Sequence, residues 1–308
     1  MARTRAQDKA GDKVKQESAP PTTAKKSETA KRRQEPEDIA PQEEPKGGEA
    51  AEEGEPSEAP PPAKKIKQAE ADDDHVEKAA VSVEARENTS KIPRLLGAYG
   101  AIPLENSGLS EPHKPTAETM FAHLLNAMLT TTRISQQIAA KTVRTVIAAG
   151  YADLQTLEKS SWEERTKVLT DGGYTHYREK TATQLGDLAE LVRGKYEGDL
   201  SNLLKAAKEE AGSARGVTEV RDGVRKRLQE VKGLGNVALD VFCDSVQGLW
   251  TELAPFLDSR SAKAAGTIGL PIDVQELYEA VGENPVEMCK LASALTTVRL
   301  DKKEREFW

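Results

Sequence analysis

The chain has 308 residues, of which 37% are hydrophobic and 4% aromatic, and its formal net charge is −7. Residues 1–90 hold 16 Lys and Arg against 21 Asp and Glu, and residues 91–308 hold 28 against 30. This balance excludes a protein that is basic throughout, so a nucleic-acid surface would have to be a local basic stripe. No apolar stretch approaches the roughly 18 residues that a membrane span needs, and we expect no membrane partner.

The first 90 residues contain no Leu, Phe, Tyr or Trp and are rich in Glu, Lys, Ala and Pro. Such a segment cannot bury enough apolar surface to offset the entropy lost on folding. We therefore predict a disordered tail over residues 1–90 and a folded domain over residues 91–308.

Within this tail, Lys64, Lys65 and Lys67 follow three consecutive prolines, and a looser basic cluster lies at residues 31–33. Nuclear import receptors bind short basic peptides of this kind. The cluster therefore predicts an import receptor as partner and the nucleus as location. The alternative is an ordinary solvated charge run in a tail rich in Lys and Glu.

From Pro93 onward the apolar residues recur at helical spacing, and we find no convincing two-residue alternation of the kind that marks a strand. The sequence therefore predicts an all-α fold. Thr116 should cap the first clear helix, and Ser161 with Glu164 forms a capping-box pattern. The expected helices start after Thr116 and then cover about 135–149, 161–172, 177–193, a segment from 200, 217–231, 236–249, 259–267, 273–281 and 285–298, with a loop over 211–216.

The cysteines and histidines suggest no cofactor. Cys243 and Cys289 form no Cys-x-x-Cys pair, which favours an intracellular chain without a disulfide framework or an iron–sulfur centre. The four histidines are scattered and lack the spacing of metal ligands. We therefore expect no metal site.

Gly233, Leu234 and Gly235 form a Gly-x-Gly turn between two helical segments, in a hairpin over about residues 217–250. Glycine lets the backbone turn sharply and approach a ligand closely, and the start of the next helix presents free N–H groups to a phosphate. Residues 225–227, Arg-Lys-Arg, add positive charge before the turn. The alternative is an ordinary corner between two helices.

A second informative segment runs from Leu257 through Asp258 to Lys263 and continues to Pro271. It consists of apolar residues, an aspartate, a small hydroxyl residue and a basic helix. A lone carboxylate downstream of a phosphate-binding turn suits chemistry on the sugar attached to that phosphate. The plain alternative is that Asp258 caps the next helix, which is compatible with such chemistry.

Together these two segments resemble the helix-hairpin-helix DNA glycosylases of the HhH-GPD superfamily, in particular the endonuclease III type. The resemblance extends over roughly residues 121–271, because the segments that begin at Phe121 and Gly172 are similar to family elements in the same order. It implies an all-α domain of two helical subdomains with a cleft between them. It also implies double-stranded DNA as partner and Asp258 as the catalytic residue.

The resemblance further implies which residues contact DNA. At the hairpin, where a bound monovalent cation would be compatible, these are Gly233, Leu234, Gly235 and Val237, and on the following helix they are Arg260 and Lys263. Candidates for a base pocket in the cleft, each more often a core or surface residue, are Thr131, Thr132, Tyr174 and His176.

Several positions depart from the endonuclease III pattern. Val237 stands where that branch has a lysine that attacks the sugar and forms a Schiff base, and the four C-terminal cysteines of its iron–sulfur cluster are absent. Lys232 replaces a proline, Leu239 a small residue, and Thr132 a glutamine that fills the gap left by a flipped base. We therefore expect a monofunctional glycosylase without lyase activity and without an iron–sulfur cluster.

The expected activity is hydrolysis of the N-glycosidic bond of a damaged or mismatched base flipped out of DNA, by a monomer that acts in base-excision repair. Two other classes stay open. One is a catalytically inactive DNA-binding or scaffold protein that keeps the glycosylase fold. The other is an interaction protein whose tail is the working part. The lesion and the opposite base stay open as well.

Replacing Lys64, Lys65 and Lys67 by alanine should move a fluorescent fusion from the nucleus to the cytoplasm, because the import receptor loses the charges that it binds. Fluorescence microscopy checks this expectation, with residues 31–33 also replaced in a second variant. A nuclear signal that survives both changes would contradict the import prediction.

Overall fold

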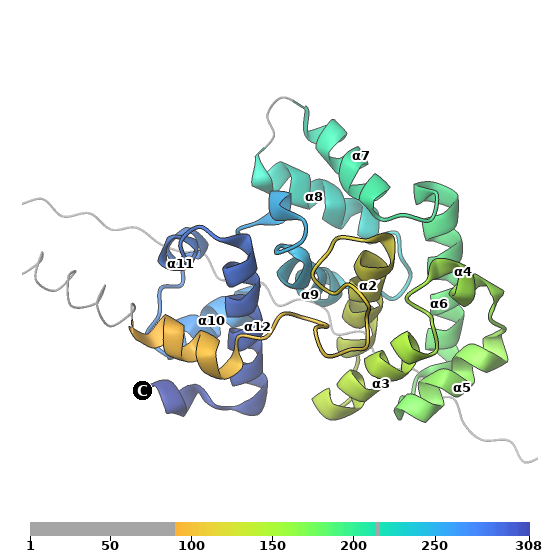
Figure 1. The fold of residues 1–308 in the computed structure, drawn as a ribbon, viewed down its shortest axis with the longest axis horizontal. Coiled ribbons are helices and arrows are strands. Elements are labelled where there is room, and N and C mark those ends of the chain that lie inside the picture. The colour runs from red at the N-terminus through yellow and green to blue at the C-terminus, as the bar shows by residue number, and fades with distance from the viewer. Residues whose placement is uncertain (1–89, 213–215) are drawn as a thin grey trace, which may run out of the picture. The chain divides into compact units, whose positions relative to one another are not determined.

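The computed structural model describes residues 90–212 and 216–308, all of which belong to one compact unit of the chain. Apart from residue 90, the predicted tail with its basic clusters lies outside the described residues. Within them every regular element is an α-helix or a short 3₁₀-helix and none is a strand, which confirms the all-α prediction (Figure 1). No helix in this part is long and apolar enough to cross a membrane.

The predicted helices occur in the expected order. After a helical segment over residues 90–99, the elements are α2 (Ala117–Thr130), α3 (Gln136–Ala148), α4 (Leu154–Lys159), α5 (Trp162–Gly172), α6 (Arg178–Tyr196), α7 (Ser201–Ala211), α8 (Val217–Leu228), α9 (Asn236–Val246), η2 (Thr251–Leu253), α10 (Ser259–Thr267), α11 (Val274–Ala280), α12 (Pro285–Asp301) and η3 (Glu304–Phe307). The segment over 90–99, α4 and the two 3₁₀ turns were not predicted. The predicted end of α6 was wrong, because one glycine inside a long helix costs only about 1 kcal/mol.

Side-chain caps start several of these helices. Thr116 accepts a hydrogen bond from the backbone N–H of Thr119 at 3.1 Å, which satisfies a donor that the first turn of α2 leaves free. At α5, Ser161 and Glu164 accept from each other's backbone N–H groups, and the capping-box prediction is confirmed. Gly173 ends α5 with φ of 94°, a left-handed conformation that favours glycine.

Buried apolar side chains of the described residues gather in two clusters. The elements from α2 to η2 build the first cluster, and the 90–99 segment, α10, α11, α12 and η3 build the second. Helix α9 packs against both α2 and α12, so it joins the two clusters (Figure 1). This arrangement agrees with two helical subdomains. The chain passes from one cluster to the other between Leu253 and Leu257, directly before Asp258.

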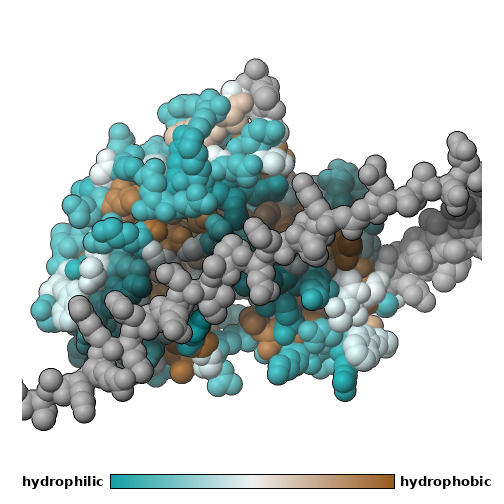
Figure 2. Space-filling view, turned by 180° about the vertical axis from the view of Figure 1, so that it is seen from behind, coloured by the Kyte–Doolittle hydropathy of each residue, from teal (hydrophilic) through white to brown (hydrophobic). Residues whose placement is uncertain are grey.

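The face of the molecule seen in Figure 2 is mostly hydrophilic, and its hydrophobic residues lie in separate patches. Among the described residues, the large apolar side chains that stay exposed are Trp162, Val237, Ile272, Val286, Leu300 and Trp308. Val286 and Leu300 both belong to α12, and the other four come from different parts of the chain. Val237 lies in the first turn of α9, next to the hairpin turn, where the resemblance places a DNA contact.

Gly172 marks a close approach of two helices that a side chain would disturb. A Cβ atom at this position would lie 2.8 Å from the Cα of Thr142 in α3, and Thr142 Oγ1 donates to the Gly172 carbonyl at 3.2 Å. The backbone of α3 must shift to accept any larger residue.

Gly172→Ala should therefore lower the free energy of unfolding by about 1–3 kcal/mol, because the added methyl overpacks the contact between α3 and α5. The matched control is Gly194→Ala in α6, where a Cβ meets nothing within 4 Å. This second change should stabilise the protein by up to about 1 kcal/mol. Urea unfolding of both variants measures the difference, and equal stability of Gly172→Ala and the wild type would contradict the packing argument.

Candidate functional site

The hairpin between α8 and α9 turns at two glycines and leads into a helix start that has no side-chain cap. Gly233 has φ of 96°, a left-handed conformation that favours glycine, and a Cβ there would displace the side-chain amide of Gln184 in α6, whose nitrogen would lie 2.5 Å away. Gly235 is the N-cap of α9, and no side chain caps this helix. The first N–H groups of α9, including that of Val237, are therefore free of a side-chain cap, at the positive end of the helix dipole.

The two other hairpin residues have opposite environments. The Leu234 side chain is buried in the first cluster, where it anchors the turn. Val237 is 43% exposed. Of the two side chains, only that of Val237 is accessible to a macromolecule that binds at the hairpin.

Most of the cations near the hairpin already have acidic partners. Arg225 pairs with Asp240 at 2.8 Å, Arg227 pairs with Glu210 at 2.7 Å, and Lys226 pairs with the same Glu210. Lys232 pairs with Asp187 of α6 at 3.0 Å. The basic run before the turn thus offers phosphate less free charge than its sequence suggests. Lys263 on α10, by contrast, is exposed and has no ion pair within the described residues.

Asp258 is the N-cap of α10 and is only 2% exposed. Its Oδ1 accepts from the backbone N–H of Arg260 at 2.9 Å and from the Arg260 side-chain Nε at 2.8 Å. Its Oδ2 accepts from the Ser261 hydroxyl. Burial raises the pKa of the Asp258 carboxyl, but the hydrogen bonds from Ser261 and Arg260 outweigh burial and leave the pKa below its usual range. The group is therefore an ionised carboxylate at neutral pH.

The loop before Asp258 is fastened to both helices of the hairpin. Gln247, just beyond the end of α9 and fully buried, exchanges two hydrogen bonds of 3.0 Å with the backbone of Phe256. Arg221 of α8 donates to the Pro255 carbonyl at 2.9 Å, and its guanidinium lies 5.0 Å from the centre of the Phe256 ring. Arg221 and Gln247 thus connect the hairpin to the segment that carries Asp258.

A second carboxyl group, Asp244 of α9, lies beside Asp258. Its Oδ1 accepts the backbone N–H of Asp258 at 3.2 Å, and its side chain is buried. Burial, followed by the negative charge of Asp258, raises the pKa of Asp244 well above its usual range. The same arrangement thus shifts the two neighbouring carboxyl groups in opposite directions, with the pKa of Asp244 raised and that of Asp258 lowered. Asp244 was not predicted from the sequence, where its signal is an acidic residue on the buried side of an apolar helix.

None of the four base-pocket candidates is among the residues that hydrogen-bond to the Asp258 side chain, which are Arg260 and Ser261. Thr131 and Thr132 donate to carbonyls of α2, at 2.8 and 3.1 Å. Tyr174 is 1% exposed within the first cluster, and its hydroxyl accepts from Thr181 at 3.2 Å.

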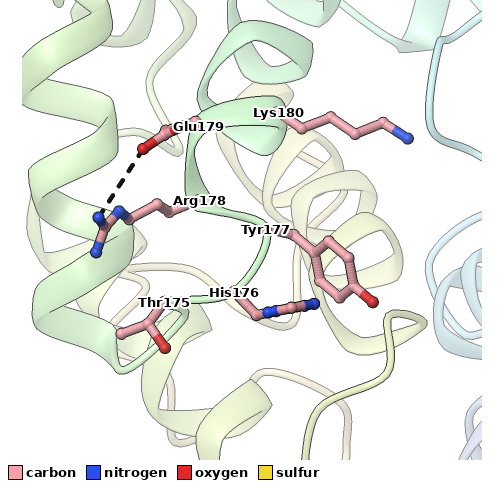
Figure 3. Close-up of a pocket in the computed structure, with 6 residues that line it drawn as sticks. All are labelled: Thr175, His176, Tyr177, Arg178, Glu179 and Lys180. Carbon is pink, nitrogen blue, oxygen red and sulfur yellow. Dashed lines mark ion pairs between the residues drawn. The ribbon is translucent and has the colours of Figure 1, made fainter. Parts of the chain in front are cut away.

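His176 lines an open hollow of about 490 Å³ at the start of α6. The residues around it are Thr175, His176, Tyr177, Arg178, Glu179 and Lys180 (Figure 3). The His176 and Tyr177 rings lie edge to face at 4.4 Å, and the Lys180 side chain extends away from them. The residues that line the hollow all come from one continuous segment at the start of α6, so the hollow lies on the surface of a single element.

Three other buried titratable groups are uncharged at neutral pH. His123 of α2 lies 3.2 Å from the Ser245 hydroxyl of α9, and burial lowers its pKa to about 4, so the ring is neutral. Burial raises the pKa of Cys243 and of Cys289 to about 12, which keeps both thiols protonated. Within residues 90–212 and 216–308, no group of three His, Cys, Asp or Glu side chains is placed to hold a metal ion.

No family model matches the chain, and no curated protein matches it. Among solved structures, it is similar to a 3-methyladenine DNA glycosylase, MagIII of H. pylori, bound to 1,N6-ethenoadenine. The identity is 14% and the TM-score 0.41, and the match covers 70% of this chain and 98% of that one. A likeness at this level leaves the function to be argued from the side chains themselves.

Asp244→Asn should make the stability of the protein less dependent on pH. A carboxyl whose pKa is higher in the folded than in the unfolded state stabilises fully below the unfolded pKa of about 4, and this contribution is lost as pH rises toward the folded pKa. Asparagine can still accept the Asp258 N–H but does not titrate. The variant should therefore match the wild type near pH 4 and exceed it at pH 7–8, as measured by urea unfolding. Parallel pH curves for the two proteins would rule out a raised pKa at Asp244.

Proposed function

We propose that the chain is a base-excision DNA glycosylase of the HhH-GPD kind, which hydrolyses the N-glycosidic bond of a damaged or mismatched base in double-stranded DNA. The observation that carries this proposal is the coupling of two features. Asp258 is an ionised carboxylate at a helix start, and hydrogen bonds from α8 and α9 fasten its loop to a hairpin with an uncapped helix start.

The proposed role of Asp258 is electrostatic stabilisation of the transition state. As the bond between C1′ and the base nitrogen breaks, the electron pair leaves with the base and positive charge builds on the sugar. A nearby carboxylate stabilises that charge, and it can orient the water whose oxygen bonds to C1′. One proton of the water is released, and the departing base takes up a proton. No covalent bond to the protein is needed.

DNA binding is assigned to the hairpin and to α10. The backbone around Gly233 and Gly235 and the N–H of Val237 would hold a phosphate, and Arg260 and Lys263 would add charge. The free energy of phosphate binding has to offset the few kcal/mol that flipping a nucleotide out of the duplex costs. Because Lys263 is unpaired within the described residues, it is the cation most ready for this role.

The absence of lyase chemistry is proposed from the side chains at the hairpin. Val237 has no amine, so it cannot form a Schiff base with the sugar. Lys232, the nearest amine in sequence, is paired with Asp187 at 3.0 Å. The product would thus be an intact strand that carries an abasic site.

Access to Asp258 demands a movement. Both carboxylate oxygens are occupied by protein donors, and the group is 2% exposed. Of these donors, the Arg260 side chain is 39% exposed and is the one that can leave without unwinding α10. A DNA phosphate would attract the guanidinium, so that the sugar could approach Oδ1.

The same burial supports the second candidate, a catalytically inactive DNA-binding protein. If Arg260 stays on Asp258 when DNA binds, the hairpin still holds phosphate but the carboxylate never reaches a sugar.

Nuclear location and the import receptor remain predictions from the tail, and the monomeric state remains a prediction as well.

Asp258→Asn should keep the fold and the DNA affinity, because the amide has the same shape and can still cap α10. It should abolish base release, because a neutral amide cannot stabilise the developing sugar cation. The assay uses duplexes with uracil, alkylated, oxidised and mismatched bases, followed by alkali to cut at abasic sites. Asp273→Asn is the matched control, since Asp273 is an exposed N-cap of α11.

Three results would count against the assignment. Base release that is unaffected by Asp258→Asn overturns the mechanism. A covalent complex trapped by borohydride overturns the monofunctional assignment and directs attention to Lys232 and Lys263. Duplex binding without base release on any substrate of the panel favours the inactive DNA-binding protein.

A further inference from the structure

The two oxygens of the Asp258 carboxylate have different kinds of partner. Oδ1 faces Arg260, through both the backbone N–H and the side chain. Oδ2 accepts from the hydroxyl of Ser261, which is fully buried in the first turn of α10. Separate donors on each oxygen fix the rotation of the carboxylate about its last bond, which a single donor would not do.

The direction of the hydrogen bonds around Ser261 follows from its single hydroxyl proton. Because the Asp258 carboxylate can only accept, Ser261 donates its proton to Oδ2. The Ser261 and Thr296 hydroxyl oxygens are 3.0 Å apart, so Thr296 must be the donor of that second bond. The result is a chain of two hydroxyl groups that starts on α12, passes through α10 and ends on the carboxylate. Aligned hydrogen bonds of this kind strengthen each other.

The other charged groups that face Asp258 come from three helices. On α10, Arg260 donates to Oδ1 but is partly exposed. On α9, Asp244 is close enough for the charge of Asp258 to raise its pKa, after burial as the larger cause. On α12, Arg299 lies one turn beyond Thr296, and burial lowers its pKa while the charge of Asp258 opposes that shift. The buried Nε of Arg299 has no hydrogen-bond partner within the described residues.

When Arg260 moves to a phosphate, its guanidinium leaves the carboxylate. The Ser261 hydroxyl is then the side-chain donor that stays on Asp258, together with the Arg260 backbone N–H. The hydroxyl chain would thus keep the group charged and oriented at the moment when the sugar arrives.

We propose that Ser261 and Thr296 form a hydroxyl relay that holds the Asp258 carboxylate in its working orientation, which makes both of them positioning residues. The proposal rests on the proposed function, because it gives the relay the task of presenting Asp258 to a nucleotide sugar. A merely structural role, in which the two hydroxyls only tie α10 to α12, predicts a loss of stability without a change in the properties of Asp258.

The first test measures the carboxyl of Asp258 directly, by NMR titration of its side-chain carbon in the protein alone. Ser261→Ala should raise the pKa of Asp258, because a donor to the charged form is lost. Thr296→Val should raise it less, and Thr296→Ser should leave it at the wild-type value, since serine keeps the hydroxyl. Ser259→Ala is the matched control, because Ser259 lies on the same helix turn and is exposed. An unchanged pKa in Ser261→Ala overturns the relay.

The second test measures base release in a single turnover, on whichever duplex of the uracil, alkylated, oxidised and mismatched panel the wild type cleaves. Ser261→Ala should slow release by at least about tenfold, the effect of one hydrogen bond to a charged group, while the dissociation constant for the duplex stays within about twofold. Thr296→Val should slow release less, and Thr296→Ser should behave as the wild type. Equal rates in Thr296→Val and Thr296→Ser would overturn the role of Thr296.

The two tests separate the relay from the proposed function. If Ser261→Ala does not fold, the pair Thr296→Val and Thr296→Ser decides, because both side chains fit a position that is only partly buried. If the wild type releases no base from any duplex, the proposed function fails. The NMR titration still decides whether the two hydroxyls control the charge of Asp258.

Discussion

The structure depends on the burial of one ionised carboxylate. Removing a charged carboxylate from water is costly unless its oxygens receive hydrogen bonds from the protein. Asp258 meets this condition with donors from Arg260 and Ser261, and its backbone N–H is held by Asp244. These partners lie on α9 of the first cluster and on α10 of the second. The carboxylate can therefore be buried only where the two clusters meet.

Helix α9 connects the surroundings of Asp258 to the hairpin. Its first turn holds the uncapped N–H groups that suit a phosphate, and Asp244 lies eight residues further along, or about 12 Å along the helix axis. Because α9 also packs against both α2 and α12, the distance between the phosphate site and the carboxylate is set by a rigid element rather than by a loop. A nucleotide held at the hairpin would therefore find Asp258 at a fixed spacing.

Much of this fold could be predicted from local signals. Thr116 and the Ser161 capping box mark helix starts through bonds that span three residues, and the start of α10 at Asp258 follows the same logic. The hairpin could be predicted because Gly233 has a positive φ that the sequence already suggests through its glycines. Helix α4 could not, since six residues are too few to show a period.

The partners of Asp258 escaped prediction for a different reason. The contact with Asp244 spans 14 residues and a loop, and the contact between Ser261 and Thr296 spans 35. No local pattern encodes such pairs. The burial of Tyr174 likewise depends on tertiary packing rather than on the glycine-rich turn in which it lies.

The central claim is that DNA draws Arg260 away and lets a sugar contact Asp258. A crystal structure of the protein with a duplex that contains a tetrahydrofuran abasic analogue tests this claim most directly. The account predicts the Arg260 guanidinium on a DNA phosphate, Ser261 still bonded to Oδ2, and Oδ1 within about 3–3.5 Å of the anomeric position of the analogue. A complex in which Arg260 remains on Asp258 and the analogue lies elsewhere would contradict the account.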